Sequence, residues 1–193
     1  MKEILVVNAC INREVSRTNR LSSELVKVLQ KRYHYENVKE LVLEDENFQP
    51  LNSQTLKKRL DLVKKSDFSD KMFQYANQLI CADCIIIAAP YWDLGFPAML
   101  KNYIENVSVA GLTYIYNEQG RPIGQCKAEH IYYVTTCGGY IRNLNLGFDT
   151  INALSVLFGI PDCKCFTAEG LDIQTNNIND IMKNAVEKLR ESI

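Results

Sequence analysis

The sequence lacks an excess of charge of either sign, and it is poor in histidine. Its 193 residues include 22 Lys and Arg against 23 Asp and Glu, which gives a net charge of −1 at pH 7. Nucleic-acid-binding proteins concentrate positive charge on one surface, so this balance predicts that nucleic acid is not a partner. Only two histidines accompany seven cysteines. Because a structural zinc site usually takes four ligands in two close pairs, no metal site is expected.

A long hydrophobic run is also absent near the N-terminus, where only the four residues Ile4 to Val7 are consecutively apolar. This run is far too short for a signal sequence or a membrane span, so we expect neither export nor membrane insertion. An odd number of cysteines cannot pair completely, and we expect reduced thiols in a cytoplasmic protein. Cys81 and Cys84 have thioredoxin-like spacing, but they end a helix and enter a strand. We therefore expect them to be a buried structural pair.

The pattern of apolar residues predicts an α/β fold in one domain that spans residues 1–193. Short β-branched runs without alternation, such as Ile4 to Val7, are typical of strands buried on both faces of a parallel sheet. Helices are expected where apolar residues recur at spacings of three and four. The expected strands are 4–7, 38–43, 84–89, 131–135 and 162–168, and the expected helices are 18–33, 67–80, 97–110, 148–158 and 178–189. This alternation predicts a three-layer sandwich, a five-stranded parallel sheet with helices on both faces.

Two segments lie outside this alternation. Residues 44–65 are polar and include a Lys57-Lys58-Arg59 cluster, which we interpret as a solvated helical face or a mobile loop rather than a binding patch. Residues 111–127 predict a short strand and turn between the third and fourth core strands.

In sheets of this kind, ligands bind beyond the carboxyl ends of the strands, so the loops that follow the strands are the candidate sites. The first such loop, residues 8–19, contains no glycine. This excludes a dinucleotide-binding G-x-G-x-x-G turn and a Walker A loop. Ser16 and Thr18 instead lie at the start of a helix, where free N–H groups and the helix dipole suit a monophosphate. The alternative is that one of these residues is simply an N-cap.

Two further loops offer surfaces for a planar ring. Residues 88–97 contain the only tryptophan of the chain, Trp92, beside Tyr91. These aromatic side chains could cover a ring while the backbone of the turn bonds to its heteroatoms, or they could fold under the loop as a small core cluster. In residues 135–140, Gly138 and Gly139 would permit close approach of a ligand and positive φ angles, although a turn could need them for geometry alone.

Four stretches of the sequence resemble the flavodoxin-like NAD(P)H:quinone reductases and FMN-dependent azoreductases, and the similarity is colinear over nearly the whole chain. They are Asn8 to Leu21, Ala89-Pro90-Tyr91-Trp92 with Leu100-Lys101-Asn102-Tyr103, Ala110-Gly111-Leu112-Thr113-Tyr114 with Asn117-Glu118-Gln119-Gly120, and Thr135 to Gly139. The resemblance implies a flavodoxin-like fold and an FMN-containing two-electron reductase. It also implies a homodimer with each active site at the subunit interface.

The resemblance assigns three groups of residues to the cofactor. The phosphate would be surrounded by Cys10, Ser16, Arg17 and Thr18, the isoalloxazine would be lined by Pro90, Tyr91, Trp92, Asp93 and Leu94, and its pyrimidine end would face Thr136, Cys137, Gly138 and Gly139. Trp92 and Tyr140, together with aromatic side chains from the partner subunit, would shape the acceptor pocket. No catalytic side chain is required, because the cofactor carries the hydride chemistry.

The implied activity is ping-pong hydride transfer from NADH or NADPH to a quinone, an azo compound or a similar small acceptor. FAD in place of FMN stays open. Cys10 replaces a serine common in azoreductases, and Asp93 replaces a frequent asparagine, where a carboxylate would disfavour anionic reduced flavin. Two alternatives are a flavodoxin-type electron carrier, a class that tends to be strongly acidic, and a flavin-binding redox sensor that uses Cys10 and Cys137.

Overall fold

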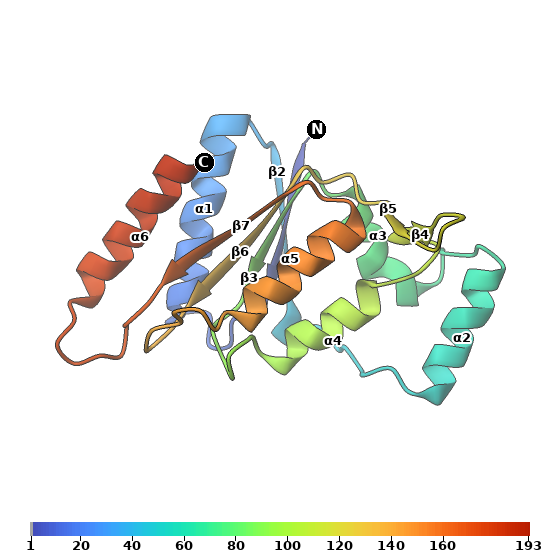
Figure 1. Ribbon diagram of the computed structural model, residues 1–193, viewed down its shortest axis with the longest axis horizontal. Coiled ribbons are helices and arrows are strands. Elements are labelled where there is room, and N and C mark those ends of the chain that lie inside the picture. The colour runs from blue at the N-terminus through green and yellow to red at the C-terminus, as the bar shows by residue number, and fades with distance from the viewer. Residues whose placement is uncertain (1) are drawn as a thin grey trace.

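Five parallel strands form the middle layer of the protein in the computed structural model, which describes residues 2–193 (Figure 1). The strands are β1 (Glu3–Asn8), β2 (Asn37–Val42), β3 (Cys84–Ala88), β6 (His130–Thr136) and β7 (Asp162–Ala168). The α-helices are α1 (Arg17–Tyr33), α2 (Ser53–Lys64), α3 (Gln74–Cys81), α4 (Ala98–Val107), α5 (Leu146–Phe158) and α6 (Ile178–Ser192). A hairpin of β4 (Tyr114–Tyr116) and β5 (Pro122–Gly124) forms a second, antiparallel sheet. The predicted three-layer α/β sandwich is confirmed.

The strand order is β2-β1-β3-β6-β7. The chain runs from β1 outward to β2 and then returns to β3 on the other side of β1, with every pairing in this sheet parallel. The order of the strands therefore reverses between β1 and β3. In open α/β sheets this reversal leaves a crevice at the carboxyl edge, and the loops after β1 and β3 border it.

The two faces of the sheet carry separate cores because the strands are buried on both sides. Leu5, Val7 and Ile85 belong to the core beneath α3, α4 and α5, and Ile4 and Val6 belong to the core beneath α1 and α6. All five residues of β3 are buried. The β-branched runs in the sequence thus mark the central strands, which hold the strand-end loops in fixed relative positions.

Capping side chains define the helices that border the carboxyl edge. Ser16 accepts a hydrogen bond from the Asn19 backbone N–H and caps α1, while Asn145 does the same for α5 through Phe148. At the far end of α5, Gly159 takes a left-handed φ of 77° and ends the helix. Since α1 and α5 start just after β1 and β6, their N-termini face the same edge of the sheet.

The structure differs from the sequence prediction in residues 44–81. The expected helix 67–80 is replaced by a 3-10 turn, Lys71–Phe73, followed by α3, because Asp70 caps the turn through the Met72 backbone N–H. The polar segment contains the helix α2, none of whose side chains is fully buried, although Leu62 and Val63 pack against the core. Arg59 holds this helix against α4 by donating hydrogen bonds to the carbonyl groups of Glu105 and Ser108. The interpretation of this charge cluster as a solvated helical face or a mobile loop therefore holds for the exposed Lys57 and Lys58, on a helix, but not for Arg59, which is partly buried.

None of the helices in residues 2–193 is long and apolar enough to cross a lipid bilayer. All seven cysteines are unbridged. Cys84 is buried, but Cys81 is exposed at the end of α3, so the expectation that both form a buried pair was wrong. The thiols separate because Cys81 ends on the solvent side of its helix, whereas Cys84 enters the central strand β3.

Candidate functional site

Four loops meet at the carboxyl edge of the sheet, and we call them loop one (residues 9–16), loop two (89–97), loop three (137–145) and loop four (169–177). Backbone hydrogen bonds connect loops one, two and three to the end of the neighbouring strand. The Ala9 N–H donates to the Ala88 carbonyl at 2.8 Å, the Tyr91 N–H to Thr136 at 3.0 Å, and the Cys137 N–H to Ala168 at 2.9 Å. The loops therefore form one continuous surface above β1, β3, β6 and β7.

Asn8, the last residue of β1, fixes the start of loop one. Its side chain is fully buried, and its amide nitrogen donates to Asn19 Oδ1 at 3.0 Å and to Glu40 Oε1 at 2.7 Å. Its Oδ1 accepts from the Cys10 backbone N–H at 2.9 Å. These three bonds join β1 to β2, to α1 and to the loop itself, and they satisfy most of the hydrogen-bonding capacity of the amide.

The N-terminus of α1 presents backbone donors rather than free hydroxyl groups. Ser16 Oγ accepts from the Asn19 N–H at 3.2 Å, and the Thr18 hydroxyl lies 2.6 Å from the Thr136 hydroxyl, where both side chains are buried. The two hydroxyls therefore do not converge on open space, and Ser16 is an N-cap. No hydrogen bond among residues 2–193 occupies the backbone N–H groups of Arg17 and Thr18. Such unpaired N–H groups at a helix start favour an anion.

The Arg17 side chain is directed away from loop one. Its Nη1 lies 2.7 Å from Oδ1 of Asp172 in loop four. Arg13, on the other side of loop one, pairs with Asp45 at 3.1 Å. Both cations of this region are thus paired with carboxylates of other loops, which the sequence analysis did not anticipate.

Loop two ends in a tight turn with an unusual backbone. The Trp92 N–H donates to the Gly95 carbonyl at 3.3 Å, and the Gly95 N–H donates back to Trp92 at 2.7 Å. The two residues at the tip, Asp93 and Leu94, have positive φ angles of 49° and 64°. Asp tolerates this conformation, but for Leu it costs about 1 kcal/mol. Strain of this kind concentrates at functional sites. Within residues 2–193 the Asp93 and Leu94 N–H groups have no hydrogen-bond partner, and both residues are exposed.

The aromatic side chains of loop two do not fold under it as a core cluster. Trp92 is 46% exposed, and the half-buried Tyr91 donates its hydroxyl to the Leu144 carbonyl at 2.7 Å, which braces loop two against loop three. The Leu146 N–H, at the start of α5, donates to the Leu94 carbonyl at 3.0 Å. Tyr140 is also exposed and lies beside loop four, where Asn176 donates to its hydroxyl at 3.4 Å.

The two glycines of loop three have different roles, and neither takes the positive φ that glycine permits. A Cβ atom on Gly138 would lie 2.2 Å from Oδ2 of Asp172, so a side chain there would displace the Asp172 carboxylate. A Cβ atom on Gly139 would meet nothing within 4 Å. Gly138 thus serves the protein's own geometry, whereas Gly139 borders open space at the edge of the sheet.

The two thiols near this edge, Cys10 and Cys137, have raised pKa values and are therefore poor nucleophiles. Burial raises the pKa of Cys10 to about 11, against a smaller opposing effect of Ser16, and its Sγ lies 3.7 Å from the Ala88 carbonyl. Burial also raises the pKa of Cys137. Because a reactive cysteine needs its thiolate form, both raised pKa values weigh against a thiol-based redox sensor.

Loop four with Asp172, and the hydrogen bonds of Asn8, were not predicted from the sequence. The rule that ligands bind after the strands also applies to the residues that follow β7, so Glu169 and Gly170 could have been flagged. The pairing of Arg17 with Asp172 had no such signal, because 155 positions separate the two residues.

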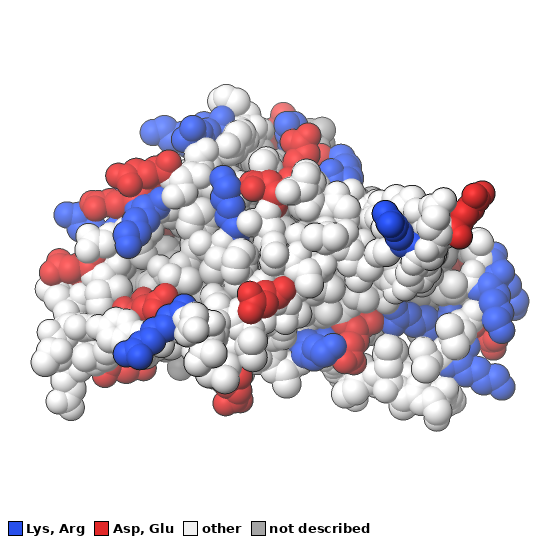
Figure 2. All heavy atoms as spheres, in the orientation of Figure 1, with Lys and Arg blue, Asp and Glu red and all other residues white. Residues whose placement is uncertain are grey.

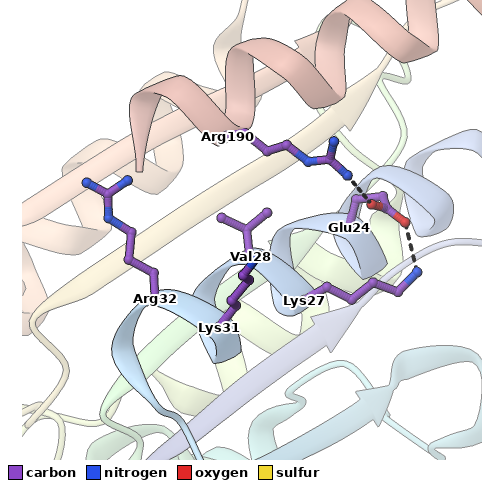
Figure 3. Close-up of a pocket in the computed structure, with 6 residues that line it drawn as sticks. All are labelled: Glu24, Lys27, Val28, Lys31, Arg32 and Arg190. Carbon is purple, nitrogen blue, oxygen red and sulfur yellow. Dashed lines mark hydrogen bonds and ion pairs between the residues drawn. The ribbon is translucent and has the colours of Figure 1, made fainter.

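A surface hollow of about 660 Å³ lies between α1 and α6, away from the four loops (Figure 3). Glu24 in this hollow bonds to Lys27 at 2.8 Å and to Arg190 at 3.3 Å, and Lys27 is the main cause of its lowered pKa. The remaining lining is long, flexible Lys and Arg side chains around Val28. It contains no aromatic surface and no thiol, so it offers nothing for a planar redox cofactor.

Comparison with known proteins gives a consistent result over the full length. A family model described as a flavodoxin-like fold matches residues 2–193. An "FMN-dependent NADH:quinone oxidoreductase" of Clostridium perfringens is 34% identical over 193 residues, which cover 97% of this chain and 96% of that protein.

Solved structures share the fold at lower sequence identity. An azoreductase from Bacillus anthracis superposes with a TM-score of 0.85 at 20% identity, covering 100% of this chain and 98% of that one. An FMN-dependent NADH-azoreductase from the same species, solved in complex with FMN, gives a TM-score of 0.81 at 17% identity, covering 100% and 97%. The chain therefore belongs to the flavodoxin-like family that includes the FMN-dependent NADH:quinone oxidoreductases.

Proposed function

We propose that this protein is an FMN-dependent oxidoreductase that takes reducing equivalents from NADH or NADPH and passes them to a quinone, an azo compound or a similar small acceptor. The observation that carries this proposal is the set of unpaired backbone N–H groups, from α1 and loop two, at one edge of the sheet. Similarity over nearly the whole chain to proteins named for this activity supports it.

The start of α1 fits the phosphate of FMN. Its unpaired N–H groups at Arg17 and Thr18 point along the helix axis, and the positive end of the helix dipole adds to their attraction for a dianion. In this proposal the buried Cys10 packs beneath loop one, and Ser16 orients the first turn of α1 because it caps the helix. Thr18 acts through its N–H group, because its hydroxyl is bonded to Thr136.

Loops two and three fit the ring. The unpaired N–H groups of Asp93 and Leu94 suit the N5 and O4 side of the ring, and the open space beside Gly139 suits its pyrimidine end. Pro90, Tyr91, Trp92, Thr136 and Cys137 are the other residues that we propose to line it. A carboxylate at Asp93 would oppose the build-up of negative charge on the ring, which lowers its tendency to be reduced.

When bound, FMN supplies a reversible acceptor and donor of hydride, and the protein needs no nucleophile or acid of its own for this step. The protein orients the ring through backbone donors that are already fixed by the sheet. Trp92 and Tyr140 shield one side of the site from water and offer flat apolar surface to an aromatic acceptor.

The proposal predicts a coloured protein. Apo-protein mixed with FMN should show quenched flavin fluorescence, and the bound flavin should lose its visible absorbance when NADH or NADPH is added without oxygen. Menadione or an azo dye should then restore the absorbance with repeated turnover. A protein that binds no FMN would contradict the proposal, and a flavin that accumulates a stable semiquinone without turnover would favour an electron carrier.

We further propose that two copies form a homodimer across the exposed apolar surface around loops two and three. Trp92, Leu94, Leu144 and Leu146 are 46% to 52% exposed, and Val156 on α5 is 72% exposed. Figure 2 shows that the face over α5 carries few charged side chains, which gather instead at its margins. Exposed large apolar side chains on a face with few charges are typical of an interface.

A charge on α5 should weaken this dimer. We expect Val156→Lys to lower the sedimentation coefficient at micromolar concentration, because lysine would be desolvated in the interface. Val38→Lys, at an exposed apolar position on the edge strand β2, is the matched control and should sediment like the wild type. Monomeric wild-type protein at 100 μM, roughly the upper range for a specific dimer, would contradict the proposal.

A further inference from the structure

Asp172 connects loop four to the helix that we propose for phosphate binding. Its Oδ1 lies 2.7 Å from Nη1 of Arg17, the first residue of α1, and the two side chains are 71% and 37% exposed. The Asp172 backbone N–H also donates to the Gly138 carbonyl in loop three at 2.9 Å. A carboxylate of loop four is thus paired with the side chain of the first residue of α1, a helix start whose dipole and N–H groups favour anions.

The ion pair is not needed to hold loop four in place. The Gly170 N–H donates to the Gly139 carbonyl at 2.6 Å, the Leu171 N–H donates to Cys137 at 3.2 Å, and Asn176 donates to the Gly170 carbonyl at 2.8 Å. Leu171 is almost fully buried among the residues beneath α1 and α6. Exposed ion pairs contribute little to stability, so the loop should keep its conformation when the Asp172 charge is removed.

The Asp172 carboxylate also lies close to loop three. A Cβ atom on Gly138 would lie 2.2 Å from its Oδ2 and 2.9 Å from its Cγ. The carboxylate therefore packs against loop three, which we propose for the flavin, and at the same time neutralises Arg17. A guanidinium group is well suited to bind a phosphate with two parallel hydrogen bonds, and here that capacity is used by a side chain of the protein.

We infer that Asp172 is an internal competitor of the FMN phosphate for Arg17 and sets the affinity of the protein for its cofactor. This inference rests on the proposed function. In the free protein Asp172 forms an ion pair with Arg17. When FMN binds, Arg17 leaves the carboxylate and pairs with the phosphate. Asp172 then remains nearby, and its negative charge repels the phosphate. The protein consequently binds FMN less tightly than the same fold without this carboxylate, and it selects phosphorylated flavin less strongly over riboflavin.

The experiment measures flavin affinity directly, by fluorescence quenching of FMN and of riboflavin titrated with full-length apo-protein at low salt. We expect Asp172→Asn to tighten FMN binding about three- to tenfold and to leave riboflavin binding unchanged. Arg17→Gln should weaken FMN binding. In the Arg17→Gln background, Asp172→Asn should lose most of its effect, because the competition requires the guanidinium.

Asp45→Asn is the matched control for a change in net charge. Asp45 is an exposed carboxylate that pairs with Arg13 at 3.1 Å near the same loop, but its partner does not belong to α1. It should change FMN affinity less than twofold. Circular dichroism and thermal unfolding of each variant establish that the fold is retained.

Three results would overturn the inference: equal or weaker FMN binding in Asp172→Asn, an equal gain for riboflavin, or a full gain in the Arg17→Gln background. Each of these leaves the proposed function intact, because FMN still binds. A wild-type protein that binds no FMN would instead overturn the proposed function, and this inference with it.

Discussion

Replacing Gly139 with valine is expected to weaken FMN binding roughly 10- to 100-fold while the free protein keeps its stability. The reason is that a Cβ atom at this position meets no protein atom within 4 Å, yet the space that it would enter is where we propose the pyrimidine end of the flavin. The backbone φ of Gly139 lies outside the left-handed region, so a side chain adds no strain of that kind. FMN titration and chemical unfolding of the same samples measure the two effects.

Gly139→Ala supplies a graded control, because one methyl group fills less of the space and should weaken FMN binding less than valine does. Gly138→Ala supplies the contrast, since its methyl group would collide with Asp172 and displace the carboxylate in the free protein. If Gly139→Val bound FMN as tightly as the wild type, the proposed position of the ring would be wrong. If it unfolded the protein, Gly139 would have a structural role instead.

The second large effect is expected at Asn8. Asn8→Asp should lower the free energy of unfolding by roughly 3 kcal/mol or more at neutral pH, because a buried carboxylate would replace an amide and face Glu40. The amide nitrogen that now donates to Glu40 at 2.7 Å and to Asn19 at 3.0 Å would be lost. Since Asn8 also holds the Cys10 N–H, FMN affinity should fall together with stability. Urea denaturation measures the change.

A compensating variant makes this prediction specific. Glu40→Gln introduces an amide that can donate to the new carboxylate, so the double variant Asn8→Asp, Glu40→Gln should recover much of the lost stability. Glu40→Gln alone should have a smaller effect than Asn8→Asp, because Glu40 is exposed and can turn toward water. Failure of the double variant to recover would show that the contact between positions 8 and 40 is not what destabilises Asn8→Asp.

Most of the secondary structure could be predicted because the signals are local. The β-branched runs at β1 and β3 and the apolar spacing of α1 and α6 each lie within one element, and the structure confirms them. Residues 44–81 were less readable for the opposite reason. The boundaries there depend on Asp70 as a cap and on the anchoring of Arg59 to α4, and neither leaves a periodic pattern in the sequence.

The sequence by itself determined the parallel α/β architecture and the strand-end loops in which a ligand should lie, because burial on both faces of a sheet demands continuous apolar strands. Only the tertiary structure decided how the side chains of those loops are used. Thr18 pairs with Thr136 and Arg17 with Asp172 across 118 and 155 positions of sequence. Such pairs follow from strand order and register, which bring distant strand ends together and which the pattern of any single segment does not encode.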